Sequence, residues 1–268
     1  MGDKRNNNFV KPVYRKAKKE TETAKKPAVV TEAKAKERAE QSISFVSDKM
    51  KNIENGVAVT VKVKAISPIH LSSGQADVNV DADVVHDKYG VPYFPAKRLK
   101  GLLYESALEV KEMAETAGME FICQKTIDEL FGHISSPVQL IVEDLHLAGY
   151  EAIKEDLEYL EQRYPEYIRK EDVLQEFTSL RYQTAINRET GTAKDGSLRN
   201  IRVVDAGTEF DGVWELRNAG QEHLEALALA MQNLSLAGGK RNRGCGEIIC
   251  VMSEQKELVE QAIRKDAV

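Results

Sequence analysis

The segment Gly56–Ile66, with the sequence GVAVTVKVKAI, constrains the fold more than any other stretch of the chain. Apolar and polar residues alternate along it, and β-branched side chains predominate. Because successive side chains of a strand point to opposite faces of a sheet, this pattern predicts a strand with one buried face. The chain must therefore supply apolar elements that cover one side of a sheet.

Two amphipathic helices are predicted to provide that cover. Apolar residues recur at the spacing of one helical face over Pro95–Ala117 and again over Glu222–Leu236. Further strands are predicted at Val138–Leu147, within Asn200–Leu216 and at Glu247–Met252. The order strand, helix, strand, strand, helix, strand is that of the ferredoxin-like fold shared by RNA-recognition domains. The predicted fold class is therefore α+β, with a ferredoxin-like (RRM-like) βαββαβ core.

Insertions interrupt this predicted core. Tyr150–Tyr164 has the pattern of an acidic amphipathic helix and lies in an acidic helical insertion over about residues 150–178. Leu180–Asn187 and the run from Asn200 form the arms of a ribbon around a turn that contains Gly191 and Gly196, which gives a β-hairpin over about residues 180–202. A short helix is also predicted at Cys123–Phe131, ended by Gly132.

The chain divides into a tail and a folded domain. Residues 1–50 are rich in Lys, Glu, Ala, Thr and Asn and have the composition of a flexible charged tail, which leaves the folded domain at 51–268. The N-terminus has no signal-peptide pattern, and no apolar run is long enough to span a membrane. The three cysteines form no CxxC pair, which indicates reduced thiols. We therefore expect a cytoplasmic protein with no membrane partner.

Charge is distributed unevenly along the chain. The formal net charge is −5, but most of the negative excess lies in Glu105–Glu176. Outside the tail, basic residues cluster at Lys97–Lys100, Arg181–Arg202 and Lys240–Arg243. A local basic face is what binds nucleic acid, and an acidic total does not exclude it. The first cluster begins the helix predicted at Pro95–Ala117, where cations are disfavoured, so an anion is expected nearby.

The glycine-rich segment Ala237–Gly246, AGGKRNRGCG, interleaves four glycines with Lys240, Arg241 and Arg243. Glycines allow positive φ and close approach of the backbone, while main-chain N–H groups and guanidinium forks bind phosphate. The segment is either a solvated basic turn or a cradle for a phosphate backbone. A Walker loop is excluded, because Cys245 follows Gly244 where that motif needs lysine.

An acidic loop follows the first predicted strand, with Asp77, Asn79, Asp81, Asp83 and Asp87 crowded together. It fails as an EF-hand, because alanine replaces the required glycine and lysine stands where the bidentate glutamate belongs. Two interpretations stay open: a turn-forming acidic loop, or a site where Asp81 and phosphate oxygens hold a divalent ion.

Nearby aromatic and histidine residues allow similar alternatives. Tyr89, Tyr93 and Phe94 either stack on bases or pack in the structure, and His86 either assists proton transfer or lies on the surface. His70 is expected to pack or hydrogen-bond locally. Trp214, which is predicted to lie in a strand, is expected in the core.

Four segments, in this order, resemble the RAMP superfamily of CRISPR-associated proteins, and in particular the repeated backbone subunit of type III effector complexes. They are VDADVVHDKYGVPYFPAKRLKG (Val80–Gly101), ELFG (Glu129–Gly132), the stretch Arg181–Phe210 and AGGKRNRGCGE (Ala237–Glu247). The family's small, serine-rich run before Leu-Lys-Gly is replaced here by Ala-Lys-Arg.

The resemblance implies a subunit that coats a guide CRISPR RNA and engages complementary target RNA. Copies of the chain would stack into a helical filament beside other effector subunits. The hairpin would serve as a thumb that flips a base out at regular intervals. The family's Ile-Asp-x-x-Val pattern falls on Val80–Val84, which places a target-cleaving aspartate at Asp81, with Asp83 as second choice. Asp81 would hold a divalent metal ion, and magnesium is the first choice for that ion.

On this interpretation, Asp81 is a metal ligand or a general base while a neighbouring 2′-hydroxyl attacks the phosphate. The alternatives are a non-catalytic structural subunit that binds the guide, or a stand-alone endonuclease that processes guide precursors. Candidate RNA-binding residues are Lys97, Arg98, Lys100, Arg181, Arg188, Arg199, Gly238, Gly239, Lys240, Arg241 and Arg243.

Overall fold

The computed structural model describes residues 56–76 and 80–265, which all lie in one compact unit of the chain. The tail predicted at residues 1–50 lies outside the described residues, as do Asp77 and Asn79 of the acidic loop. Within the described part, no helix is both long enough and apolar enough to cross a lipid bilayer.

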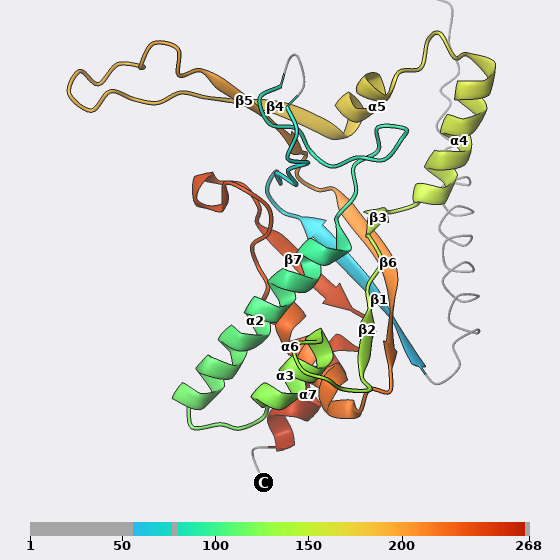
Figure 1. Cartoon of the computed structure of the whole chain (residues 1–268), viewed down its shortest axis with the longest axis vertical. Coiled ribbons are helices and arrows are strands. Elements are labelled where there is room, and N and C mark those ends of the chain that lie inside the picture. The colour runs from blue at the N-terminus through green and yellow to red at the C-terminus, as the bar shows by residue number, and fades with distance from the viewer. Residues whose placement is uncertain (1–55, 77–79, 266–268) are drawn as a thin grey trace, which may run out of the picture. The chain divides into compact units, whose positions relative to one another are not determined.

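The core sheet has the strand order β2-β6-β1-β7, and every neighbouring pair is antiparallel (Figure 1). Its strands are β1 Gly56–Ala65, β2 Gln139–Ile141, β3 His146–Leu147, β6 Glu209–Arg217 and β7 Ile248–Met252. The short strand β3 also pairs with β6. In β1, Val59, Val61 and Val63 are buried while Lys62 and Lys64 are exposed, which confirms the alternating strand.

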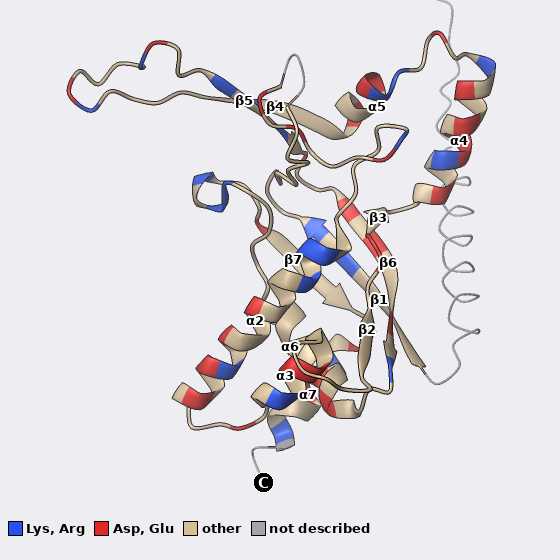
Figure 2. Cartoon of the chain, viewed as in Figure 1, with Lys and Arg blue, Asp and Glu red and all other residues tan. Residues whose placement is uncertain are grey.

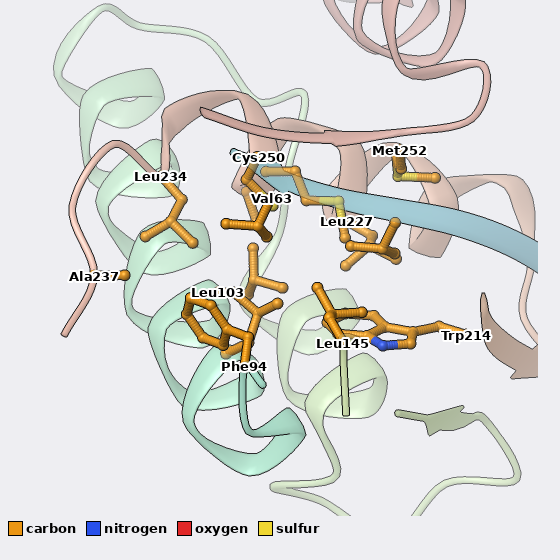
Figure 3. Packing of buried hydrophobic residues seen from close by; sticks show 14 of the residues in the cluster. Val63, Phe94, Leu103, Leu145, Trp214, Leu227, Leu234, Ala237, Cys250 and Met252 are labelled. Carbon is orange, nitrogen blue, oxygen red and sulfur yellow. The ribbon is translucent and has the colours of Figure 1, made fainter. Parts of the chain in front are cut away.

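Helices cover the buried face of this sheet and confirm the α+β class. They are α2 Ala96–Thr116, α3 Gln124–Phe131, α6 Gln221–Asn233 and α7 Gln255–Lys265. Figure 3 shows the packing that results: Val63 of β1 lies among Leu103 of α2, Leu227 of α6 and Cys250 of β7, all buried. Helix α3 ends at Gly132, whose φ of 78° is the left-handed conformation that glycine adopts easily.

The strand predicted at Val138–Leu147 is wrong as a single element, because it breaks into β2 and β3. The intervening residues turn their polar groups to other partners. The Glu143 carbonyl accepts a hydrogen bond from the Trp214 indole at 3.0 Å, and Leu145 pairs with Phe94. Leu145 also occupies space that a side chain at Gly212 of β6 would need, since a Cβ there would lie 2.8 Å from Leu145 Cδ2. The strand is therefore interrupted where Glu143 and Leu145 contact residues that are distant in sequence.

The insertion and the hairpin form a second part of the domain. Helices α4 Tyr150–Arg163 and α5 Lys170–Phe177 precede a two-stranded antiparallel sheet made of β4 Thr178–Gln183 and β5 Arg199–Val204. The predicted run Asn200–Leu216 is thus two strands, β5 and β6, separated by a turn at Gly207 with φ of 87°. In Figure 1 the hairpin β4–β5 extends away from the core sheet.

Candidate nucleic-acid interface

The glycine loop, Ala237–Gly246, is a rigidly anchored turn. Its centre is one turn of 3₁₀ helix, η1 Arg241–Arg243, between Lys240 and Gly244, which both have left-handed conformations. Gly239 N–H donates a hydrogen bond to the His70 carbonyl at 2.9 Å, and a Cβ at Gly238 would lie 2.8 Å from that same oxygen. Close approach of the loop to its own chain therefore requires Gly238, and this anchoring leaves the cations of η1 facing outward.

Lys240, Arg241 and Arg243 are all exposed at the tip of this loop. Lys240 and Arg243 also line a groove of about 480 Å³, whose other wall is the hairpin. The hairpin residues that line it are Gln183, Thr184, Ala185, Lys194, Asp195, Gly196, Ser197 and Arg199. The groove thus brings together four cationic side chains and, among its described lining residues, one carboxylate.

Two further contacts join the glycine loop to strand β4. Arg243 Nη1 donates to Gln183 Oε1 at 3.3 Å, and Arg181 Nη1 lies 3.7 Å from Cys245 Sγ. Two of the three predicted basic clusters therefore meet at one place. Figure 2 shows their positive charge on the hairpin and on the glycine loop, whereas α4 is predominantly acidic. Arg188 lies, exposed, in the hairpin's connecting segment and does not line the groove.

The third cluster, at the start of α2, is placed differently. Lys97 is exposed, while Arg98 is half-buried and donates to the Ser72 carbonyl at 2.8 Å. Burial lowers the pKa of the half-buried Lys100. A carboxylate lies at this helix start, because Asp144 accepts a hydrogen bond from Ala96 N–H at 2.7 Å. This cluster and the glycine loop are linked through the segment Ile69–Ser72. Arg98 donates a hydrogen bond to that segment from the cluster, and Gly239 donates one to it from the glycine loop.

The aspartate loop, Val80–Val85, lies along strand β5. Asp81 is exposed, and it exchanges two hydrogen bonds of 2.8 Å with Asn200: Asp81 N–H donates to Asn200 Oδ1, and Asn200 N–H donates to Asp81 Oδ2. Ala82 and Ile201 form a parallel bridge. Asn200 follows Arg199, which lines the groove, while Asp81 itself is not one of the lining residues.

Asp83, the second candidate, has a different environment. Its Oδ1 accepts hydrogen bonds of 2.8 Å from Arg202 Nε and from Val84 N–H. The Asp83 and Arg202 side chains are only 14% and 8% exposed. This carboxylate is therefore paired and largely shielded, whereas Asp81 keeps Oδ1 without a hydrogen-bond partner among the described residues.

A metal site here fits the chain only in a shared form. Within residues 56–76 and 80–265, no group of three or more His, Cys, Asp or Glu side chains is arranged to hold a metal ion. Magnesium is commonly held by one or two carboxylates together with phosphate oxygens and water. The exposed Asp81 suits that arrangement, and Asp83 does not, because Arg202 occupies its carboxylate.

The remaining candidates are mostly structural. His70 is buried, as expected for a residue that packs in the structure, and its Nδ1 lies 2.7 Å from the carbonyl of Arg202, a partner that is distant in sequence. Tyr89 is buried with its hydroxyl 2.5 Å from Glu158 Oε1, and Phe94 packs against Phe210 in the core. Trp214 is fully buried, which confirms its predicted place in the core.

Several groove residues escaped the sequence-based predictions. Gln183, Thr184 and Ser197 line the groove together with the predicted Arg199 and with Lys194, which lies within the predicted basic cluster Arg181–Arg202. Their signal in the sequence is weak, because uncharged polar residues in a hairpin are typical of any solvent-exposed ribbon. They become recognisable only once the glycine loop is known to lie opposite them.

The chain is similar to known proteins in both sequence and fold. The family model of the RAMP superfamily matches residues 62–249. The chain is 27% identical over 199 residues to the CRISPR system Cms endoribonuclease Csm3 of Methanocaldococcus jannaschii, covering 67% of this chain and 73% of that protein.

Solved structures share the fold. A chain in the type III-B Cmr-beta complex bound to cognate target RNA matches with a TM-score of 0.52 at 14% identity, over 75% of this chain and 98% of that one. The apo state of Cmr-beta gives the same TM-score and coverage at 13% identity. The family match extends from β1 to β7 and so includes the hairpin, the aspartate loop and the glycine loop. The chain belongs to the RAMP superfamily.

Proposed function

We propose that this chain is a guide-RNA-binding backbone subunit of a type III CRISPR effector complex in the cytoplasm. The observation that carries the proposal is the groove in which Lys194, Arg199, Lys240 and Arg243 converge from the hairpin and the glycine loop. The relative from M. jannaschii is named as a CRISPR endoribonuclease, and the matching solved chains come from a type III-B complex. Guide CRISPR RNA, target RNA, other effector subunits and further copies in a helical filament are the proposed partners.

We assign the core sheet to the ferredoxin-like class. The order β2-β6-β1-β7 with antiparallel neighbours supports this assignment. Helix α2 lies between β1 and β2 along the chain, and α6 lies between β6 and β7. On this assignment, the hairpin β4–β5 is an insertion between the second and third strands of the core and acts as the thumb.

Phosphate contacts would hold the guide in the groove. Lysine and arginine side chains on opposite walls neutralise successive phosphates, and the released counterions make the affinity depend on salt. The glycine loop supplies Lys240, Arg241 and Arg243 on a turn that its contacts with the His70 main chain hold in place. Phosphate contacts carry no sequence information, which suits a subunit that must accept guides of any sequence.

Cleavage of target RNA is assigned to Asp81. Its Oδ1 accepts the proton of a ribose 2′-hydroxyl, whose oxygen attacks the adjacent phosphorus. The bond from phosphorus to O5′ breaks, and the leaving oxygen takes a proton from solvent water, which leaves a cyclic phosphate and a 5′-hydroxyl; the proton on Asp81 then returns to solvent. In the alternative role, as a metal ligand, Asp81 would hold a magnesium ion together with the phosphate, and that ion would stabilise the charge that develops on the phosphate oxygens. In-line placement of the hydroxyl supplies much of the rate.

The test is the Asp81→Ala substitution in the assembled, guide-loaded complex supplied with complementary RNA. We expect guide loading to persist and cleavage to fall at least about 100-fold. Unchanged cleavage would remove Asp81 from the mechanism. A wild-type complex that binds target without cutting it would leave the structural guide-binding role.

A further inference from the structure

We propose that Arg202 and Asn200 are positioning residues that fix the aspartate loop to the hairpin of the same chain, so that the thumb carries and aligns the cutting carboxylate. This inference rests on the proposed function of Asp81. It assigns a role in the reaction to two residues that would not contact the scissile phosphate.

Three consecutive residues of each segment are joined. Asp81 and Asn200 exchange two hydrogen bonds, Arg202 N–H donates to the Ala82 carbonyl at 3.0 Å, and Arg202 Nε donates to Asp83 at 2.8 Å. All of these contacts join residues that are 119 or 120 positions apart in the sequence. The aspartate loop therefore runs beside β5 as a short parallel strand, although the two segments are far apart along the chain.

Arg202 is the centre of the junction. Besides Asp83, its guanidinium reaches the Thr178 hydroxyl at 3.1 Å, and its carbonyl lies 2.7 Å from His70 Nδ1. His70 in turn accepts the Gly239 N–H of the glycine loop at its own carbonyl. The Arg202 side chain thus joins the start of the hairpin to the aspartate loop, and the Arg202 main-chain carbonyl contacts the segment that anchors the glycine loop.

The contacts also select one orientation of the Asp81 carboxylate. Its Oδ2 is held by the Asn200 N–H, which leaves Oδ1 as the oxygen that faces a reactant. Arg202 meanwhile neutralises Asp83, so the loop presents one negative charge to the RNA rather than two. Both effects favour approach of a phosphodiester to a fixed carboxylate oxygen.

The test is a double-mutant cycle in the guide-loaded complex with Arg202→Gln, Asp83→Asn and the double variant. Each single change leaves a shielded charge without its partner, whereas the double change removes both charges. We expect single-turnover cleavage to fall about tenfold or more in each single variant, with target affinity within about threefold of wild type, and to recover at least about threefold in the double variant. Arg217→Gln, which alters an exposed pair with Glu215, is the matched control.

Hydrogen exchange in the free chain supplies a readout that is independent of cutting. The Asp81 and Arg202 amides both donate across the junction, so their exchange is expected to accelerate in Arg202→Gln and not in Arg217→Gln. If Arg202→Gln does not assemble, Asn200→Ala repeats both measurements with only one side chain shortened.

Unchanged cleavage with unchanged exchange in an assembled variant overturns the inference. So does a loss of cleavage matched by an equal loss of target affinity, or a double variant as impaired as the product of the single variants. Failure of the proposed function is seen separately, in the Asp81→Ala arm, because that variant would then cut like wild type whatever Arg202→Gln does.

Discussion

The core sheet and the outer part of the hairpin are held by different physical interactions. In the core, Val61, Trp214 and Leu227 are fully buried among apolar neighbours, so the hydrophobic effect dominates. In the outer hairpin, Tyr182 and Leu198 are exposed. The base of β5 combines both kinds of interaction, because its apolar side chains from Ile201 to Val204 are buried and it also forms hydrogen bonds and the Asp83–Arg202 ion pair. Changes in the core should therefore alter stability, and changes at the hairpin should alter the geometry of the site.

The largest expected difference compares one aromatic residue from each region. Trp214→Ala should lower the free energy of unfolding by about 3–5 kcal/mol, because it removes a fully buried side chain and its hydrogen bond to the Glu143 carbonyl. Tyr182→Ala, at a position 65% exposed, should change it by less than about 0.5 kcal/mol. Urea denaturation of both variants measures the difference. Equal losses would show that the hairpin also contributes to the packed core.

A second comparison lies within the glycine loop, at the border of the two regions. Gly246 and Gly244 both have positive φ, but a Cβ at Gly246 would collide with the Ala237 carbonyl, whereas one at Gly244 would meet nothing within 4 Å. Gly244→Ala should destabilise by about 1 kcal/mol, from the left-handed conformation alone. Gly246→Ala should destabilise by about 2–4 kcal/mol, because steric overlap is added. Thermal unfolding of the pair tests this, and similar values would mean that the loop moves away from Ala237 at little cost.

The same division explains which features the sequence predicts. Strand β1 and helices α2 and α6 follow from periodic apolar patterns, because burial of one face decides each of them. The break between β2 and β3 does not follow, since it depends on Gly212 and Trp214, which lie about 70 residues away. Likewise, the sequence indicates an acidic loop and three basic clusters, but only the fold shows that Arg202 pairs with Asp83 while Lys240 and Arg243 face the hairpin.

The groove cations should affect binding and leave stability unchanged. Lys240→Ala and Arg243→Ala should each weaken binding of single-stranded RNA by up to about tenfold and reduce the slope of log affinity against log salt by about one unit or less. Both side chains are exposed, so the unfolding midpoint should stay constant. Fluorescence anisotropy at several salt concentrations measures the slope, with Arg217→Ala as the control. An unchanged slope would show that these side chains do not contact phosphate.

The smallest expected effect is a difference in reactivity between a buried thiol and an exposed thiol. Burial raises the pKa of Cys250 in β7 to about 12, whereas a hydrogen bond with the Thr126 hydroxyl lowers the pKa of the exposed Cys123 below its ordinary 9.0. The thiolate is the reactive form, so iodoacetamide should label Cys123 first, with a rate that rises below pH 9.0, and Cys250 only when the core opens. Thr126→Ala should move the Cys123 profile to higher pH, and Cys123→Ser should abolish the fast phase. Rapid native labelling of Cys250, located by mass spectrometry, would contradict a closed core, since a thiol with a pKa near 12 reacts at neutral pH only after exposure to solvent.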